Sequence, residues 1–126
     1  MQKAVLIVED ADTCASTLEI IFSTIAGLRI ITTASAEQAW KLLENPAEHI
    51  SALVTDLHMP GMDGIELIDR IRARGSHTRL PIIVITGSTD LAVPEQLRLR
   101  GVDAVFPKPY SPAMVREKLE QLLDHD

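Results

Sequence analysis

The sequence has little of several features that would each point to a particular class of protein. Cys14 is its single cysteine among 126 residues, which excludes an intrachain disulfide and a thiolate metal cluster. Aromatic residues make up 3% of the chain, so the core must be aliphatic. No apolar run approaches the roughly 20 residues that a helix needs to cross a bilayer. We therefore expect a cytoplasmic protein without a membrane partner, in which Cys14 is a small, buried and inert side chain.

Positive charge is also scarce. The chain carries 12 lysines and arginines against 18 acidic residues, a net charge of -6, which argues against direct nucleic-acid binding through a basic surface. The first residues, a short apolar run that ends in two acids, do not resemble a signal peptide. With 46% hydrophobic and 24% charged residues, the composition is typical of a folded globular protein. We expect one domain over residues 1–126, with no output domain in this chain.

Five short apolar runs alternate with five amphipathic segments. The strands are expected at Ala4–Val8, Arg29–Thr33, a run that ends at Asp56, Ile82–Ile85 and Ala104–Phe106. The helices are expected from an Asp12 or Thr13 cap to Gly27, from a Ser35 cap to Asn45, from an Asp63 cap through Ile65 to Gly75, from Val93 to Arg100, and from Ser111 and Pro112 onward with Val115, Leu119 and Leu122 facing inward. This alternation predicts an α/β fold with a mostly parallel sheet, helices on both faces and right-handed crossovers.

Polar residues follow four of the predicted strands. Glu9 and Asp10 end the first, Asp56 the third, Thr86 the fourth, and Lys108 comes just after the fifth. Because binding sites of open α/β sheets lie at the carboxyl ends of their strands, we expect these side chains to converge.

The residue types at this edge indicate phosphoryl chemistry. Converging carboxylates need a counter-charge, and Mg²⁺ prefers such oxygen ligands. The Thr86 hydroxyl and the Lys108 ammonium are both suited to phosphoryl oxygens. A carboxylate can itself attack phosphorus and form an acyl phosphate. The pattern thus predicts Mg²⁺-assisted phosphorylation of a carboxylate.

Together these motifs resemble the receiver domain of two-component response regulators. The similarity rests on Val8-Glu9-Asp10, on Asp56 with the segment 59–64 (Met-Pro-Gly-Met-Asp-Gly), on Thr86-Gly87 and on Lys108-Pro109. It covers essentially the whole chain with the family's spacing. The resemblance implies a flavodoxin-like (βα)5 doubly wound fold with strand order 2-1-3-4-5.

The resemblance also implies a role for each matching residue. Glu9, Asp10, Asp56 and the backbone carbonyl of His58 would bind Mg²⁺, and Asp56 would accept the phosphoryl group. Thr86, Gly87 and Lys108 would contact that group, Thr86 as the switch hydroxyl and Gly87 by leaving room for the donor. The family's Lys-Pro peptide is commonly cis, which Lys108-Pro109 permits.

The implied partners are a histidine kinase or histidine phosphotransfer protein as donor, and a downstream protein that binds the fourth helix, fifth strand and fifth helix. The chain would be a monomer or a weak phosphorylation-dependent dimer. It would not be an enzyme, beyond self-catalysed phosphorylation and dephosphorylation of Asp56.

One position departs from the family pattern. Many receivers carry an aromatic residue three positions before the lysine, whose ring changes rotamer with the switch hydroxyl, but this sequence has Val105. Phe106 should point to the opposite face of the sheet, and Pro107 lacks a backbone donor. We therefore hypothesise that phosphorylation rearranges the Thr86 loop and the fourth helix without an aromatic flip.

Several alternatives remain open from sequence. The chain could be a receiver excised from a hybrid kinase or larger regulator, a degenerate receiver, or a phosphohydrolase of the haloacid dehalogenase type, although His58 stands where that type has a second Asp. Simpler interpretations also exist: Asp12 and Asp63 as helix caps, the His58 side chain as solvated, and Trp40 as a partly exposed aromatic. Four basic residues are either solvated or partner contacts: Arg98, Arg100, Arg116 and Lys118.

Overall fold

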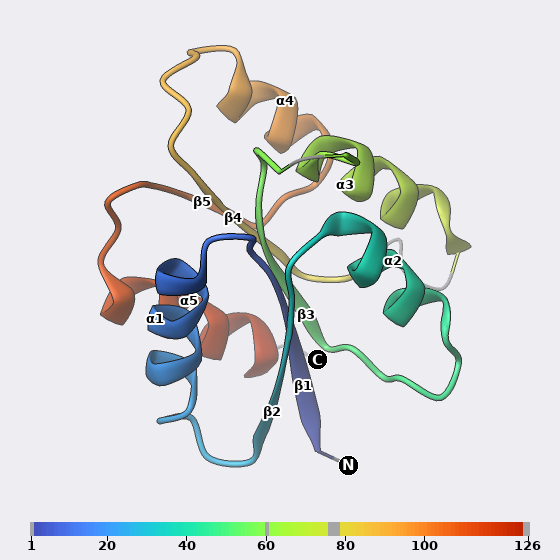
Figure 1. Cartoon of the computed structure of the whole chain (residues 1–126), viewed down its shortest axis with the longest axis vertical. Helices are drawn as coiled ribbons and strands as arrows, with labels where there is room; N and C mark the ends of the chain where they lie inside the picture. Colours follow the sequence, from blue (N-terminus) through green and yellow to red (C-terminus); the bar gives the residue numbers. More distant parts are fainter. Residues whose placement is uncertain (1, 60, 76–78, 125–126) are drawn as a thin grey trace.

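The computed structural model describes residues 2–59, 61–75 and 79–124, within which five strands alternate with five helices (Figure 1). In chain order they are β1 (Lys3–Val8), α1 (Asp12–Phe22), β2 (Leu28–Thr33), α2 (Ala36–Glu44), β3 (Ala52–Asp56), α3 (Gly64–Ala73), β4 (Ile82–Thr86), α4 (Val93–Leu99), β5 (Ala104–Pro107) and α5 (Pro112–Asp124). In this part of the chain, no helix is both long and apolar enough to cross a bilayer.

All strands are parallel, in the order β2-β1-β3-β4-β5, which confirms the predicted fold. In this register Val8 lies opposite both Thr33 and Thr55, and Asp56 lies opposite Ile85. The strands therefore end at one common edge, where the residues that follow them are brought together.

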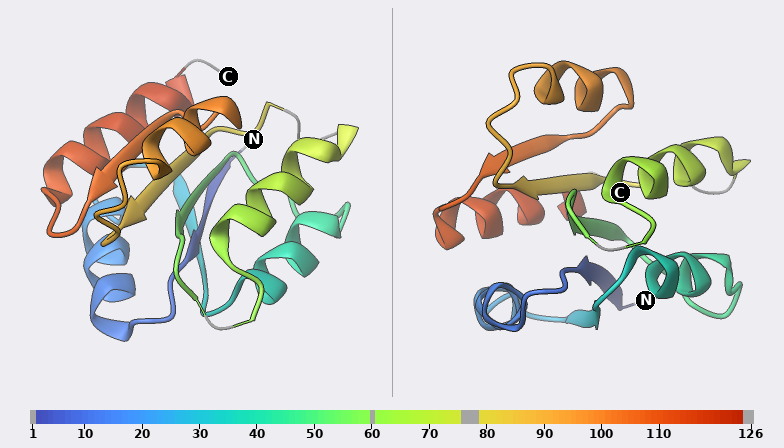
Figure 2. Two further views of the ribbon diagram at one scale, coloured as in Figure 1. Left: turned by 90° about the horizontal axis from the view of Figure 1, so that it is seen from above. Right: turned by 45° about the horizontal axis from the view of Figure 1, so that its top comes forward.

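Helices cover both faces of the sheet (Figure 2). On one face, Leu18 of α1 and Leu119 of α5 pack against the inward side chains of the central strands. On the other, residues of α2, α3 and α4 form a second cluster with the strands. The sheet is thus the middle of three layers.

The central strand β1 is buried on both faces, as its continuous apolar run predicts. Val5 and Ile7 belong to the cluster under α1 and α5, while Leu6 and Val8 belong to the cluster under α2 and α3. Complete burial of a valine, leucine or isoleucine side chain stabilises a fold by about 1.5–3 kcal/mol. This strand therefore gives a rigid base to Glu9, the residue after it.

Three of the predicted helix caps are present. The hydroxyl of Ser35 accepts a hydrogen bond from the Gln38 N–H at 3.2 Å. The carboxylate of Asp63 accepts one from the Glu66 N–H at 2.9 Å, and the hydroxyl of Ser111 accepts one at 3.3 Å in the first turn of α5. Each side chain satisfies a backbone donor that the helix leaves unpaired.

The predicted cap of α1 is wrong. The N-cap position is Ala11, which has no capping side chain, and neither Asp12 nor Thr13 fills that role. Instead the carboxylate of Glu9 accepts the Ala11 N–H at 3.0 Å. The residue expected only as a metal ligand therefore also fixes the chain where it enters α1.

The end of α1 and several burial expectations also differ. The helix stops at Phe22 rather than near Gly27, since the hydroxyls of Ser23 and Thr24 bond to carbonyls in its last turn. In α5 it is Leu123 that is buried, while Leu122 packs at the margin of the cluster. Cys14 and Ile65, which were expected to be buried and to face inward, are both half-buried. Trp40 is partly exposed, as expected, and the Arg74 guanidinium lies 5.8 Å from the centre of its ring.

The short helix α4 is tied to its neighbours at its carboxyl end. The guanidinium of Arg72 donates hydrogen bonds to the carbonyls of Arg100, Gly101 and Leu80 at 2.8–2.9 Å. Arg100 in turn pairs with Asp69 of α3 at 2.7 Å. These bonds hold the end of α4 against α3, and Arg100 therefore forms a surface ion pair within the chain.

Candidate functional site

The carboxylates of Glu9, Asp10 and Asp56 meet at the carboxyl edge of the sheet. One oxygen from each lies within 4.8 Å of the others. Glu9 is 4% exposed and Asp56 7% exposed, whereas Asp10 faces solvent. The convergence follows from the pairing of β1 with β3. Val8 lies opposite Thr55, so the next residues, Glu9 and Asp56, are brought side by side.

The ammonium of Lys108, the residue after the edge strand β5, reaches into this cluster. Its Nζ lies 2.9 Å from Asp56 Oδ2 and 3.3 Å from Glu9 Oε2. The Lys108 backbone N–H also donates to the carbonyl of Thr86 at 2.8 Å, and the Lys108-Pro109 peptide is cis, as expected. Lys108 therefore links the ends of β4 and β5 to the acids on β1 and β3.

The ionisation of this cluster reflects burial and close charges. Burial is the main factor that raises the pKa of Glu9, and the charge of Asp56 adds to it, although the Ala11 N–H and Lys108 oppose the rise. Burial by itself would lower the pKa of Lys108, but hydrogen bonding and charge from Asp56, followed by those from Glu9, outweigh it and raise that pKa well above its ordinary value. Lys108 is therefore a firmly protonated counter-charge.

Thr86 and Gly87 lie beside this cluster, at the end of β4. Thr86 is 4% exposed, and its hydroxyl oxygen accepts the Ser88 N–H at 3.0 Å. A side chain at Gly87 would meet no heavy atom of the described chain within 4 Å, apart from its immediate neighbours. Gly87 thus borders open space, which is what an approaching donor would need.

The loop after Asp56 folds back against the site. The His58 N–H donates to Asp56 Oδ1 at 3.2 Å, and the His58 side chain is exposed, as the simpler interpretation expects. A Cβ atom at Gly64 would lie 2.5 Å from the Asp56 carbonyl oxygen, so only glycine fits there. Pro60, which the sequence placed in this loop, lies outside the described residues.

Glu37 also contacts this loop, a contact that sequence reasoning missed. Its Oε1 accepts the Met62 N–H at 3.2 Å, although Glu37 belongs to the first turn of α2. From sequence it was only an acid at a helix start, a position that the helix dipole favours. The contact depends on how α2 packs beside α3, and no local motif signals it.

Val105 and Phe106 occupy opposite faces of β5, as the strand period predicts. Val105 packs against the cluster under α2, α3 and α4, and Phe106 against the cluster under α1 and α5. The aromatic ring of this strand is therefore on the face away from α4.

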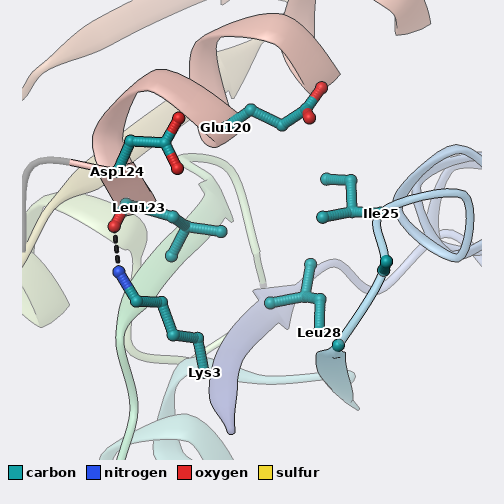
Figure 3. A pocket seen from close by; sticks show the side chains of 8 residues that line it. Lys3, Ile25, Leu28, Glu120, Leu123 and Asp124 are labelled. Atoms are coloured by element: carbon teal, nitrogen blue, oxygen red, sulfur yellow. Dashed lines mark hydrogen bonds between the residues drawn. The ribbon is translucent and has the colours of Figure 1, made fainter.

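A separate pocket of about 360 Å³ lies at the opposite, amino-terminal edge of the sheet (Figure 3). Ile25 and Leu28 form one side of it, and Glu120 and Asp124 of α5 lie across from them (Figure 3). Lys3 extends along the pocket and donates a hydrogen bond to the carbonyl of Leu123. Its lining residues are distinct from those of the acidic cluster.

The donor set at the acidic cluster fits a hard divalent cation. Three carboxylates offer oxygen atoms at close range, and the ammonium of Lys108 already balances part of their charge. Mg²⁺ prefers such oxygen ligands and retains waters that a phosphoryl oxygen can replace. The solvent-facing position of Asp10 leaves one side of the cluster open to such an ion.

Comparison with known proteins gives consistent matches along the chain. The family model described as the response regulator receiver domain matches residues 5–120. A protein described as a chemotaxis protein CheY homolog from Campylobacter jejuni is 30% identical over 118 residues, which are 94% of this chain and 90% of that protein. The chemotaxis protein CheY of Pseudomonas aeruginosa is 30% identical over 123 residues, 95% of each chain.

Solved structures agree with these matches. A response regulator receiver protein from Pseudomonas putida superposes with a TM-score of 0.86 at 27% identity, over 96% of this chain and 98% of its own. A CheY-like response regulator receiver domain protein from Methanospirillum hungatei gives a TM-score of 0.88 at 26% identity, over 99% and 96%.

Proposed function

The chain belongs to the response regulator receiver domain family, and on this premise we propose that it accepts a phosphoryl group on Asp56. The donor is the phosphohistidine of a histidine kinase or histidine phosphotransfer protein. One observation carries the proposal: Asp56 ends β3 with the Lys108 ammonium 2.9 Å away and two further carboxylates beside it.

In the proposed reaction, a carboxylate oxygen of Asp56 attacks the phosphorus of the donor. The new O–P bond forms an acyl phosphate, the P–N bond of phosphohistidine breaks, and the leaving imidazole nitrogen takes up a proton. Lys108 is already hydrogen-bonded to Asp56 and supplies positive charge for the phosphoryl oxygens. The His58 N–H donates to the other carboxylate oxygen and so orients the nucleophile.

Glu9, Asp10, Asp56 and the His58 carbonyl would hold Mg²⁺, and Thr86, Gly87 and Lys108 would contact the phosphoryl group. Bound Mg²⁺ supplies charge neutralisation for the phosphoryl oxygens. The buried Thr86 hydroxyl accepts the Ser88 N–H and keeps its own hydrogen to donate to a phosphoryl oxygen. Rotation of this hydroxyl toward the phosphoryl group would shift its contact with Ser88 and so move the loop after β4.

We propose that this movement is transmitted to α4 without an aromatic flip and is recognised on the face of α4, β5 and α5. The valine at position 105 supports a mechanism that needs no ring on that face. The chain would act as a cytoplasmic phosphoacceptor and signalling module, as a monomer or weak phosphorylation-dependent dimer, rather than as an enzyme that turns over a substrate.

The proposal is tested by incubating the protein with Mg²⁺ and acetyl phosphate, and separately with beryllofluoride. Wild-type protein should gain the mass of one phosphoryl group, and Asp56→Asn should not. Asp69→Asn is the matched control because Asp69, a residue of α3, pairs with Arg100 and is not part of the acidic cluster. Equal labelling of wild-type and Asp56→Asn protein, or no Mg²⁺-dependent labelling at all, would overturn the proposal.

A further inference from the structure

The loop that follows Asp56 is held from α2 as well as by its own helix. Residues of α2 and α3 contribute to one cluster on the same face of the sheet (Figure 2), and Glu37 stands in the first turn of α2. Its Oε1 accepts the Met62 N–H at 3.2 Å. Met62 directly precedes Asp63, the N-cap of α3, so the Glu37 contact lies between the phosphoacceptor and the helix that follows it.

Gly61 makes room for this carboxylate. A Cβ atom at Gly61 would lie 2.8 Å from Glu37 Oε2, and Gly61 has a φ of +81°, a conformation that other residues rarely adopt. Two consecutive loop residues therefore receive the two oxygens of one carboxylate, Met62 by a hydrogen bond and Gly61 by the absence of a side chain. The hydrogen bond to Met62 and the space left at Gly61 thus agree on one position for the Glu37 carboxylate.

The same loop carries the group that orients Asp56. The His58 N–H donates to Asp56 Oδ1, and Gly64 closes the loop against the Asp56 backbone at the other end. Only Asp63 separates Met62 from Gly64, and the Gly64 N–H donates to the Leu57 carbonyl at 2.9 Å. A shift at Met62 therefore reaches the backbone of Asp56 and Leu57 through Gly64, which has no room to move away from them.

We propose that Glu37 is a positioning residue for the phosphorylation site: its carboxylate fixes Met62 and thereby Gly64, which lies against the backbone of Asp56 and Leu57. This inference rests on the proposed function and adds a residue on a different element to the site. Glu37 acts through the loop, by geometry, and is not one of the three acids of the cluster.

A competing explanation is that Glu37 acts only through its negative charge. An additional acid near a cation site raises the affinity for a cation over several ångströms without fixing any backbone. Glu37→Gln separates the two, because glutamine keeps a carbonyl oxygen that can accept the Met62 N–H but carries no charge. Glu37→Ala removes both.

The test measures Mg²⁺ and beryllofluoride binding by calorimetry for wild type, Glu37→Gln and Glu37→Ala. Without this hydrogen bond the loop must be ordered again when Mg²⁺ binds, a cost of up to one hydrogen bond that corresponds to about 3- to 10-fold in affinity, so Glu37→Ala should bind Mg²⁺ that much more weakly. Glu37→Gln should stay within about 2-fold of wild type, as expected when a hydrogen bond rather than a charge is kept. Amide hydrogen exchange at Met62 and Gly64 without Mg²⁺ should be faster in Glu37→Ala only.

Glu44→Ala is the matched control, since it removes an acid from the other end of α2, where Glu44 pairs with Arg74 at 3.7 Å. It should leave Mg²⁺ affinity and exchange at Met62 unchanged. If Glu44→Ala weakened binding as Glu37→Ala does, a general effect on α2 would replace positioning. If Glu37→Gln were as weak as Glu37→Ala, the charge alone would explain the effect and the proposal would be wrong.

Gly61→Ala gives a second, independent arm. Its new Cβ should displace the flexible Glu37 carboxylate, so Glu37→Ala should have less effect in the Gly61→Ala background than in wild type. Additive effects would contradict the proposed contact. A wild-type protein that bound neither Mg²⁺ nor beryllofluoride would overturn the proposed function as well, whereas normal binding by both wild type and Glu37→Ala would overturn this inference alone.

Discussion

Lys108 Nζ lies 2.9 Å from Asp56 Oδ2, and the same ammonium lies 3.3 Å from Glu9 Oε2. Both carboxylates belong to the cluster that fits a divalent cation, so the lysine contacts two of the three acids of the proposed metal site. The ammonium stabilises the cluster without Mg²⁺ and also competes with Mg²⁺ for the carboxylates. The strength of metal binding should therefore depend on Lys108.

Replacement of Lys108 by methionine should tighten Mg²⁺ binding. The variant keeps the apolar stem and removes the ammonium, so the carboxylates lose their internal counter-charge. We expect an increase in affinity of about 3- to 10-fold, on the order of 1 kcal/mol for a partly exposed charge, measured by calorimetry. Lys41→Met, which removes an exposed lysine of α2, should leave the affinity unchanged. Weaker Mg²⁺ binding in Lys108→Met would show that the lysine supports the metal site instead.

Glu9 should make stability depend on pH in the absence of metal. Burial raises the pKa of Glu9 above its ordinary value of 4.5, so the folded protein holds this proton more tightly than the unfolded chain does. Glu9 therefore contributes fully to stability when the pH is below its ordinary pKa, and this contribution is lost as the pH rises through the raised pKa. We expect the stability of wild type, relative to Glu9→Gln, to fall as pH increases from 4 to 7.

The measurement is urea unfolding in EDTA at a series of pH values. Glu117→Gln, at an exposed position of α5, serves as the control and should parallel wild type throughout. A difference between wild type and Glu9→Gln that stayed constant with pH would contradict the raised pKa.

The strand ends were predictable because parallel pairing needs only the order of the elements. Glu9, Asp56 and Thr86 each end or follow an apolar run, and the register brings these ends to one edge. The position of Phe106 on the face away from α4 followed in the same way from the two-residue period of a strand.

Contacts between helices were not predictable by such reasoning. Glu37 meets Met62 only because α2 packs beside α3, and Arg72 reaches the end of α4 for a similar reason. The entry to α1 is a related case: the N-cap residue has no capping side chain, and its own N–H is bound by the buried carboxylate of Glu9. Each of these depends on side-chain placement in three dimensions rather than on spacing along the chain.

Val105→Tyr should leave phosphorylation of Asp56 intact. Val105 lies on the face of β5 toward α4, whereas the reacting groups are Asp56 and Lys108. A ring at position 105 would alter the surface near α4 and not the acidic cluster. The rate of acetyl phosphate labelling, followed by intact mass, should stay within about 3-fold of wild type, less than 1 kcal/mol in barrier. Loss of labelling in a folded variant would contradict a switch that works without the ring.

Gly64→Ala should destabilise the protein and disturb the phosphoacceptor. Its Cβ would lie 2.5 Å from the Asp56 carbonyl oxygen and 2.8 Å from the Leu57 Cα, and backbone atoms cannot rotate away. We expect a loss of about 1–3 kcal/mol in urea unfolding, typical of overpacking, with slower labelling of Asp56. Gly75→Ala is the control, since its Cβ would meet no heavy atom of the described residues within 4 Å, its chain neighbours apart. Equal stability of the two variants would exclude the close approach at Gly64.

Arg72→Lys should loosen the carboxyl end of α4. The guanidinium donates to three carbonyls, of Arg100, Gly101 and Leu80, and a lysine ammonium cannot match this planar arrangement. The loss of charged hydrogen bonds should lower the free energy of unfolding by about 2–3 kcal/mol. Arg70→Lys, which affects only an exposed pair with Glu66, should change stability by less than about 0.5 kcal/mol.

Amide hydrogen exchange separates this local effect from a general loss of stability. The Gly101 and Val102 N–H groups bond to carbonyls of α4, so their exchange should speed up in Arg72→Lys by more than global unfolding accounts for. Exchange in the buried strand β1 should follow global stability alone. If both regions changed in parallel, Arg72 would stabilise the whole domain and would not be a specific anchor of α4. A local change would mean that the movement proposed for α4 on phosphorylation is limited to its amino-terminal half, because its carboxyl end stays attached to α3.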